Sequence, residues 1–435
     1  MVSKTKINIF WFRRDLRLED NTGLNVAIKS DRPVLPIFIF DNNILDDLED
    51  KSDARVTFIH DQITAINQQL RLKKSGINVY HGEPYKIWTE LTEAYDISEV
   101  FTNRDYEPYA RSRDKAIYEL LISKSITFNT YKDHVIFEKK EVVKDDGTPY
   151  VVFTPYSKKW KDRLQDNPFH VASNILGFDN FHTFTPDIPS LEQLGFQRSS
   201  IAIPSNDLDE ALITKYGETR NYPAINGTSR LGIHLRFGTV SIRKVAELAM
   251  SKNETFLNEL IWREFYQMIL FHFPKVVENN FRAKYDHVEW RNNEADFEAW
   301  CQGKTGYPIV DAGMRELNIT GHMHNRVRMI VASFLTKHLL IDWRWGEAYF
   351  AKNLLDFELA SNNGGWQWAA GTGTDAQPYF RIFNPESQTK KFDSELKYIK
   401  KWVPEFQELS YPKPIVDHKF ARERCLKTYK EGLGV

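Results

Sequence analysis

The stretch Ile7-Asn-Ile-Phe-Trp-Phe12 decides the fold of the first part of the chain, because it is short, apolar and rich in strand-forming residues. Similar runs follow at residues 34–40, 77–80, 99–101 and 126–129. Longer amphipathic runs lie between them and predict helices at residues 54–74, 85–94 and 109–122. This repeated β-α-β order predicts a doubly wound parallel sheet with right-handed crossovers.

The loop after the first predicted strand is unusual. It reads Trp11-Phe-Arg-Arg-Asp-Leu-Arg-Leu-Glu-Asp-Asn21 and contains no G-x-G-x-x-G motif. Sheets of this kind bind ligands beyond the carboxyl ends of their strands, but a standard dinucleotide site needs those glycines. A charged loop that braces two domains is an alternative interpretation.

The rest of the chain divides into a connector and a helical part. Between about residues 144 and 209 the pattern gives way to proline, glycine and polar residues, which predicts a long surface connector. From Leu212 onward the pattern is helical, and residues 254–273 are apolar nearly all round, as in a buried helix. We therefore expect an α/β domain at 1–135, a connector at 136–210 and an all-α domain at 211–435.

Composition limits the function classes. The 435 residues are 42% hydrophobic and 27% charged, which is typical of a globular protein of two or three domains. A net charge of −1 argues against binding nucleic acid through overall charge and leaves room for a local basic face. Cys301 and Cys425 are the only cysteines, so a reducing cytoplasmic setting is expected. No signal peptide and no apolar run of membrane-spanning length is visible.

Two helical motifs carry candidate binding groups. In Asn226-Gly-Thr-Ser-Arg-Leu-Gly, the small hydroxyl residues precede an apolar-periodic run. They predict either a simple helix N-cap or, with Arg230, a phosphate cradle. In the helix at 254–273, Glu259 shares a face with Trp262 and stands four residues before Arg263. Glu259 therefore either pairs with Arg263 or lines a pocket for a flat, hydrogen-bonding ligand such as a base.

The segment Thr320-Gly-His-Met-His-Asn-Arg-Val-Arg-Met329 does not predict a metal site. His322 and His324 are two residues apart, which points them to different faces of a helix. A polar helix terminus is the plain alternative.

The stretch Ser361-Asn-Asn-Gly-Gly-Trp-Gln-Trp, which continues to Pro385, combines paired tryptophans with four glycines. The glycines predict that it forms no long helix, and it lacks the alternation of a strand. Taken singly, Trp366 and Trp368 predict core packing.

Together the ordered motifs resemble the DNA photolyase and cryptochrome family, and most of all a class I cyclobutane pyrimidine dimer photolyase. The most specific are Gly227-Thr-Ser-Arg-Leu231, Glu259-Leu-Ile-Trp-Arg-Glu-Phe-Tyr266, Gly303-Lys-Thr-Gly-Tyr-Pro-Ile-Val-Asp311, Met323-His-Asn-Arg326 and Asn362-Asn-Gly-Gly-Trp-Gln-Trp368. The resemblance implies an N-terminal α/β antenna domain, a long connector and a C-terminal helical domain that holds FAD.

The resemblance also implies which residues bind FAD. Those expected at the pyrophosphate and its surroundings are Tyr216, Thr228, Ser229, Arg230, Leu231 and Gly232. Those expected at the flavin and ribityl chain are Phe256, Arg328, Asp356, Glu358 and Asn362. Asn362 would lie at flavin N5, where plant cryptochromes have aspartate and insect ones cysteine, so asparagine favours a repair enzyme. Phe256 and Glu358 depart from the common tryptophan and aspartate of repair enzymes.

The implied substrate is damaged DNA with a flipped-out pyrimidine dimer. Glu259 and Asn325 would bond the base edges, Trp262 and Trp368 would stack on the dimer, and Met329 would pack on it. The expected phosphate contacts are Arg220, Arg263, Arg326 and Arg381, with Lys390 and Lys391 nearby. Trp366, Trp343 and Trp290 resemble the tryptophan relay that reduces FAD.

The implied function is light-driven dimer repair by electron transfer from excited reduced FAD, carried out by a monomer. A cryptochrome-like photoreceptor without repair and a helical FAD protein with thermal redox chemistry are the alternatives. For a second, antenna chromophore, Asp105-Tyr-Glu-Pro-Tyr-Ala-Arg111 and Asp41 with Arg55 look more like deazaflavin-type members. The asparagine–glutamate pair of folate-binding members appears as Tyr109-Ala110, so deazaflavin, folate, another flavin or an empty cleft all stay open.

Overall fold

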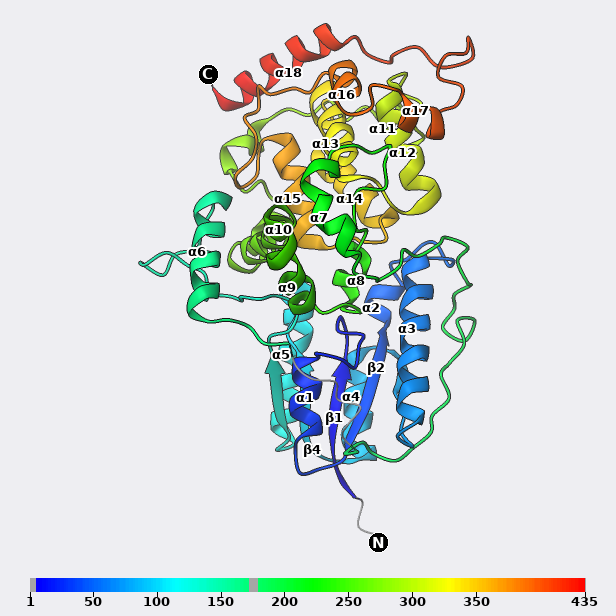
Figure 1. Cartoon of the computed structure of the whole chain (residues 1–435), viewed down its shortest axis with the longest axis vertical. Coiled ribbons are helices and arrows are strands. Elements are labelled where there is room, and N and C mark those ends of the chain that lie inside the picture. The colour runs from blue at the N-terminus through cyan, green and yellow to red at the C-terminus, as the bar shows by residue number, and fades with distance from the viewer. Residues whose placement is uncertain (1–4, 172–178, 435) are drawn as a thin grey trace. The chain divides into compact units, whose positions relative to one another are not determined.

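The computed structural model describes residues 5–171 and 179–434 (Figure 1). Contacts divide the chain into two compact units, each assembled from three separate segments. The α/β unit comprises Met1–Glu138, Arg163–Asp207 and Leu231–Leu248. The helical unit comprises Lys139–Asp162, Leu208–Arg230 and Ala249–Val435.

The α/β unit contains the predicted parallel sheet. Its strands run in the order β3-β2-β1-β4-β5, and every neighbouring pair is parallel. Their bounds are β1 Lys6–Phe12, β2 Val34–Asp41, β3 Asn78–Gly82, β4 Asp96–Asn103 and β5 Thr127–Tyr131. The quoted stretch Ile7-Asn-Ile-Phe-Trp-Phe12 lies in the central strand, which explains why all six of its residues are buried. The prediction of an α/β fold with a parallel sheet is confirmed.

Helices cover both faces of this sheet because successive residues of β1 point to opposite sides. Phe10 and Phe12 pack with α1 and α3, whereas Ile9 and Trp11 pack with α4 and α5. The helices of this unit are α1 Thr22–Ile28, α2 Asn42–Leu45, α3 Ala54–Arg71, α4 Pro84–Ala94, α5 Pro108–Ser123 and α8 Gly232–Phe237. The three helices predicted between the strands correspond to α3, α4 and α5.

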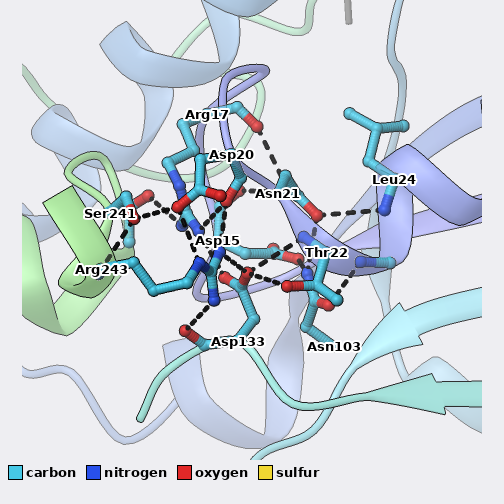
Figure 2. Close-up of polar contacts among 12 residues, drawn as sticks. Asp15, Arg17, Asp20, Asn21, Thr22, Leu24, Asn103, Asp133, Ser241 and Arg243 are labelled. Carbon is cyan, nitrogen blue, oxygen red and sulfur yellow. Dashed lines mark hydrogen bonds and ion pairs between the residues drawn. The ribbon is translucent and has the colours of Figure 1, made fainter. Parts of the chain in front are cut away.

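The charged loop after β1 forms a buried ionic network with residues far along the chain (Figure 2). Asp133 accepts from Arg17 at 2.7 Å and from Arg243 at 2.8 Å. Asp20 accepts from Arg243 at 2.8 Å and from the Ser241 hydroxyl. The loop is therefore fixed against the segment Leu231–Leu248, which belongs to the same unit.

The connector predicted at 136–210 is more ordered than expected. It contains the helix α6 Phe153–Asp166, which the sequence reading missed. Tyr156 and Trp160 on this helix are buried, and both donate hydrogen bonds to Glu264 at 3.3 and 2.6 Å. Phe181, Leu191, Leu194 and Phe196 contribute to the core of the α/β unit, so this segment does more than run over the surface.

The helical unit packs around one large apolar cluster that includes Trp300, Trp343 and Trp366. Its main helices are α7 Glu210–Thr219, α9 Ile242–Lys252 (which begins in the α/β unit), α10 Glu254–His272, α11 Glu294–Cys301, α12 Pro308–Thr320, α13 Asn325–Ser333, α14 Trp343–Asn353, α15 Leu359–Ala370, α16 Pro385–Phe392, α17 Lys397–Trp402 and α18 His418–Leu433. Single turns lie at Pro274–Val277, Ala283–His287 and Phe334–His338. Within the described ranges, no helix is long and apolar enough to cross a bilayer.

The expectation that glycines prevent a long helix near Ser361 is wrong, because α15 continues through Gly364 and Gly365. Packing outweighs the low helix propensity of glycine here. A Cβ at Gly364 would collide with the ring of Tyr266, which shows that glycine lets α15 approach α10 closely. The stretch therefore places its two tryptophans on a well-formed helix.

Candidate active site

A cavity of about 390 Å³ lies within the helical unit, between α10, α13, α14, α15 and the segment at 354–358. Residues proposed from the sequence for three different roles meet here. Those that line the cavity are Arg220, Glu259, Trp262, Arg263, Asn325, Arg328, Met329, Asp356, Glu358, Asn362, Trp366 and Trp368. Motifs separated by up to about 150 residues in the chain thus converge on one space.

Part of the cavity wall is apolar. It is formed by Ala332, Phe350, Leu354 and Trp366, whose side chains are buried. Phe350 meets Trp366 edge to face at 5.0 Å between ring centroids. A Cβ at Gly365 would meet nothing within 4 Å, so the backbone of α15 leaves open space beside this wall.

Glu259 pairs with Arg220. Arg220 is the C-cap residue of α7 and stands a few residues before the motif that begins at Asn226. The alternative that Glu259 pairs with Arg263 is wrong, because Arg263 donates to Glu358 at 2.9 Å instead. Burial raises the pKa of Glu259, and the Arg220 guanidinium opposes that rise. The Glu259 carboxylate at the cavity wall is thus held by Arg220, which remains partly exposed.

Glu358 sits deeper and is more fully bonded. It accepts hydrogen bonds from Arg263 at 2.9 Å, Gln267 at 2.9 Å and Ser361 at 3.3 Å. Two of these partners, Arg263 and Gln267, lie on α10, so the glutamate that replaces the common aspartate bonds the neighbouring helix. Arg263 is consequently committed to an internal pair.

A second ion pair lines the cavity at Arg328. Its guanidinium donates to both oxygens of Asp356 at 3.1 and 2.9 Å, and to the carbonyl of Met323 at 2.7 Å. The backbone contact fixes the arginine on the first turns of α13, so the pair presents a rigid polar edge to the cavity.

Asn362 has a defined amide orientation. Its Nδ2 donates to the backbone oxygen of Glu347 at 3.0 Å and to the Glu347 carboxylate at 2.9 Å. Both partners can accept only from the NH₂ group, so the Oδ1 acceptor remains for the cavity. Burial raises the pKa of Glu347, and the bond from Asn362 opposes the rise.

The aromatic and sulfur groups lie beside these polar pairs. Trp262 and Trp368 are both partly buried and line the cavity with Met329. Arg326, next to exposed Asn325, donates to Asn221 at 2.7 Å and stands 4.3 Å from the centroid of the Phe392 ring. The cavity thus offers flat rings together with a cation near its edge.

The other predicted cofactor residues lie outside the cavity lining: Tyr216, Thr228, Ser229, Arg230, Leu231, Gly232 and Phe256. Tyr216 and Phe256 form an edge-to-face pair at 5.0 Å, and Arg220 stands 5.4 Å from the Tyr216 ring. Arg230 has a positive φ of 52° and is exposed. Leu231 and Gly232 begin the segment that belongs to the α/β unit.

The three tryptophans of the expected relay share one region of the helical unit. Trp366 and Trp343 are buried in the same apolar cluster, and Trp290 packs against that cluster from a less buried position. Trp343 also donates its indole N–H to Asn280 at 2.9 Å. Arg381, Lys390 and Lys391 are exposed and do not line the cavity.

The sequence reading missed some cavity residues: Tyr266, Ala332, Phe350, Leu354, Phe357, Ser361 and Gly365. Tyr266, Ser361 and Gly365 stand inside quoted motifs, so proximity to a motif could have found them. Ala332, Phe350 and Leu354 carry no signal of their own, because small and apolar residues at helical spacing also predict an ordinary core.

Comparisons with known proteins identify the family to which the chain belongs. The family described as "DNA photolyase" matches residues 8–173, and the one described as "FAD binding domain of DNA photolyase" matches residues 256–410. The chain is 37% identical to a deoxyribodipyrimidine photo-lyase of Halobacterium salinarum, over 98% of this chain and 100% of that protein. The chain therefore belongs to the DNA photolyase family of enzymes.

Solved structures show the same fold over the whole chain. A bacterial class III photolyase from Agrobacterium tumefaciens superposes with a TM-score of 0.87 at 33% identity, covering 100% of this chain and 99% of that one. An archaeal photolyase from Sulfolobus tokodaii, solved with two FAD molecules, superposes with a TM-score of 0.86 at 35% identity, covering 98% and 100%. The predicted combination of an α/β fold with a helical FAD-binding part is confirmed.

FAD is the cofactor of this chain, and the cavity fits part of it. The apolar wall suits a flat ring, and the open space beside Gly365 lets such a ring approach the backbone. The polar edge formed by Arg328, Asp356 and Asn362 supplies both donors and acceptors, as a heteroaromatic ring with carbonyl and N–H groups requires.

Proposed function

We propose that the chain is a light-driven deoxyribodipyrimidine photolyase that repairs cyclobutane pyrimidine dimers in DNA. One observation carries this proposal: Glu259, Trp262 and Asn362 line a single cavity, with Trp368 and Met329 beside them. When bound, reduced FAD excited by blue light supplies the electron that opens the dimer and receives it back. The remaining task of the protein is to position both partners.

For the cofactor, we assign Asn362, Arg328 and Asp356 to the flavin edge. The Oδ1 of Asn362 offers an acceptor, which suits the N–H that flavin N5 carries in the reduced state. Glu358 would act through Arg263 and Gln267 to fix the neighbouring helix. Thr228, Ser229 and Arg230, followed in the chain by Leu231 and Gly232, would hold the pyrophosphate, with Tyr216 and Phe256 packed nearby.

For the lesion, Glu259 and Asn325 would bond the base edges, and Trp262 and Trp368 would stack on a dimer flipped out of the duplex. Met329 would fill the space beside the rings. Arg220, Arg326 and Arg381, with Lys390 and Lys391, would contact phosphates, so that affinity falls with salt although the net charge is only −1. Arg263 would contribute only by exchanging its internal partner Glu358.

The division into an antenna domain at 1–135, a connector at 136–210 and a catalytic domain at 211–435 belongs to the same proposal. So do a monomeric state, a cytoplasmic location, and a second chromophore, deazaflavin or folate, on the α/β unit.

A repair assay tests the proposal. Purified chain with reduced FAD is mixed with an oligonucleotide that contains one thymine dimer, and dimer loss is measured under blue light and in the dark. We expect loss that depends on light. A protein that holds reduced FAD but leaves the dimer intact under light would instead be a photoreceptor without repair, and dark turnover would indicate thermal redox chemistry.

The relay is tested separately with Trp366→Phe. Trp366, Trp343 and Trp290 belong to or pack on one apolar cluster, so they could pass an electron inward to oxidised FAD. We expect the variant to lose photoreduction of oxidised FAD and to keep repair when the flavin is reduced chemically. Unchanged photoreduction would exclude this relay.

A further inference from the structure

Trp262 has an aromatic partner that no role described so far explains. Phe153, at the first position of α6, stacks on Trp262 with ring centroids 3.8 Å apart and an interplanar angle of 5°. Trp262 lines the cavity and Phe153 does not. Phe153 therefore stacks on a part of the indole that does not face the cavity. Phe265 meets the same indole edge to face with ring centroids 5.6 Å apart, and Tyr266 meets it in a tilted orientation at 5.5 Å.

Phe153 is held in place by backbone contacts to another part of the site. Its N–H donates to Asp375 at 3.1 Å, and the carbonyl of Val151 accepts from Thr374 at 2.7 Å. Thr374 and Asp375 follow the C-terminal end of α15, the helix that carries Trp366 and Trp368. The start of α6 therefore links the Trp262 side of the cavity to the segment after the Trp368 helix.

The remainder of α6 is anchored on the helix of Trp262 itself. Trp160 and Tyr156 both donate to Glu264, which is buried and stands two residues after Trp262 on α10. These bonds fix the relative position of the two helices. A face-to-face contact at this distance leaves the indole little freedom to tilt, because either ring would have to enter the other.

We propose that Phe153 is a positioning residue for lesion recognition: it fixes the plane of Trp262 so that the indole is ready to stack on the flipped-out dimer. The inference rests on the proposed function of the cavity. A ring that is already oriented loses less conformational entropy on binding, so the contribution of Phe153 should appear in the affinity for the lesion. It should not appear in FAD binding or in repair of a dimer that is already bound.

The test compares Phe153→Ala, Phe153→Leu and Phe153→Trp in the FAD-loaded full chain. The Kd for a thymine-dimer oligonucleotide and for its undamaged counterpart is measured, with repair at saturating substrate and the flavin absorbance. We expect Phe153→Ala and Phe153→Leu to weaken lesion binding about 3- to 10-fold, with undamaged-DNA binding, FAD content and saturated repair unchanged. Phe153→Trp, which keeps an aromatic ring, should retain the wild-type lesion affinity. Val152→Ala, a change at the exposed neighbouring residue, should have no effect.

A double-mutant cycle separates this inference from the proposed function. Trp262→Ala alone should weaken lesion binding, and in that background Phe153→Ala should cost nothing further. If Trp262→Ala weakens lesion binding while Phe153→Leu does not, the positioning role is wrong and the lesion cavity stands. If neither change matters, the lesion cavity itself is wrong. Equal additional weakening by Phe153→Leu with and without the Trp262 indole, or loss of FAD, would also overturn the positioning role.

Discussion

Two clusters of charged residues in this chain look alike in composition and differ in how closed they are. In the ionic network of the α/β unit, the side chain of Asp133 is 0% exposed and that of Arg243 is 9% exposed. In the cavity of the helical unit, Arg220 and Glu259 are 24% and 31% exposed, and Arg328 and Asp356 are 25% and 22% exposed. The charged groups of the first cluster are paired inside the protein and closed to solvent, whereas the pairs of the second cluster are partly exposed and can exchange partners with a ligand.

The electrostatics of the network follow from this closure. Burial acts to raise the pKa of Asp133, but Arg17 and Arg243 outweigh burial and hold that pKa below its usual range. The carboxylate of Asp15 accepts from the backbone N–H of Arg13 and from the Asn103 amide, and no cationic side chain of the described residues is seen to bond it. Burial raises its pKa to about 6. The network (Figure 2) is thus a structural clamp. The cavity pairs are groups available for binding.

The largest expected effect is the loss of Asp133. Asp133→Ala leaves Arg17 and Arg243 buried without their shared carboxylate, so we expect a loss of about 3–5 kcal/mol in the free energy of unfolding. Chemical unfolding measures it.

The matched control is an ion pair on the surface that joins the same two segments. Glu19 and Lys244, the neighbours of Asp20 and Arg243, form an exposed pair, and Glu19→Ala should cost less than about 1 kcal/mol. Equal losses in the two variants would contradict the distinction between closed and exposed charge pairs.

The pH dependence of stability should show the cost of ionising Asp15. Its pKa is about 6 in the fold against an ordinary value of 3.8, so unfolding is promoted as pH rises from about 4 to about 6. The shift corresponds to roughly 3 kcal/mol. Asp15→Asn removes this ionisation. The free energy of unfolding of the variant minus that of the wild type should therefore increase by this amount between pH 4 and pH 7, measured by urea unfolding at each pH. Curves that stay parallel would mean that Asp15 ionises freely in the fold.

The contrast between the two clusters also explains what the sequence could and could not reveal. The sheet followed from local patterns such as Ile7-Asn-Ile-Phe-Trp-Phe12, because alternation and apolarity act over a few residues. The partner of Glu259 did not follow from a local pattern, because Arg220 lies at the end of a different helix and Arg263 is nearer in the sequence. Helix α15 was missed since its glycines are compensated by Tyr266, a contact that only tertiary structure supplies. The motifs predicted the polar and aromatic residues of the cavity, whereas the apolar residues of its wall could be identified only from the folded structure.

The smallest of the three effects should arise in the cavity, where Glu259→Ala removes the carboxylate of the partly exposed Arg220–Glu259 pair. Arg220 remains partly exposed and can be solvated, so the free energy of unfolding should change by less than about 1 kcal/mol. Lesion binding should weaken by about 1.5–3 kcal/mol, or roughly 10- to 150-fold, because a charged hydrogen bond to the base edge is lost. Glu254→Ala, on the exposed first turn of the same helix, is the control and should leave lesion affinity unchanged. FAD absorbance read in the same samples decides the assignment: loss of FAD in the Glu259 variant would mean that this carboxylate serves the cofactor, whereas retained FAD with weakened lesion binding would place it with the substrate.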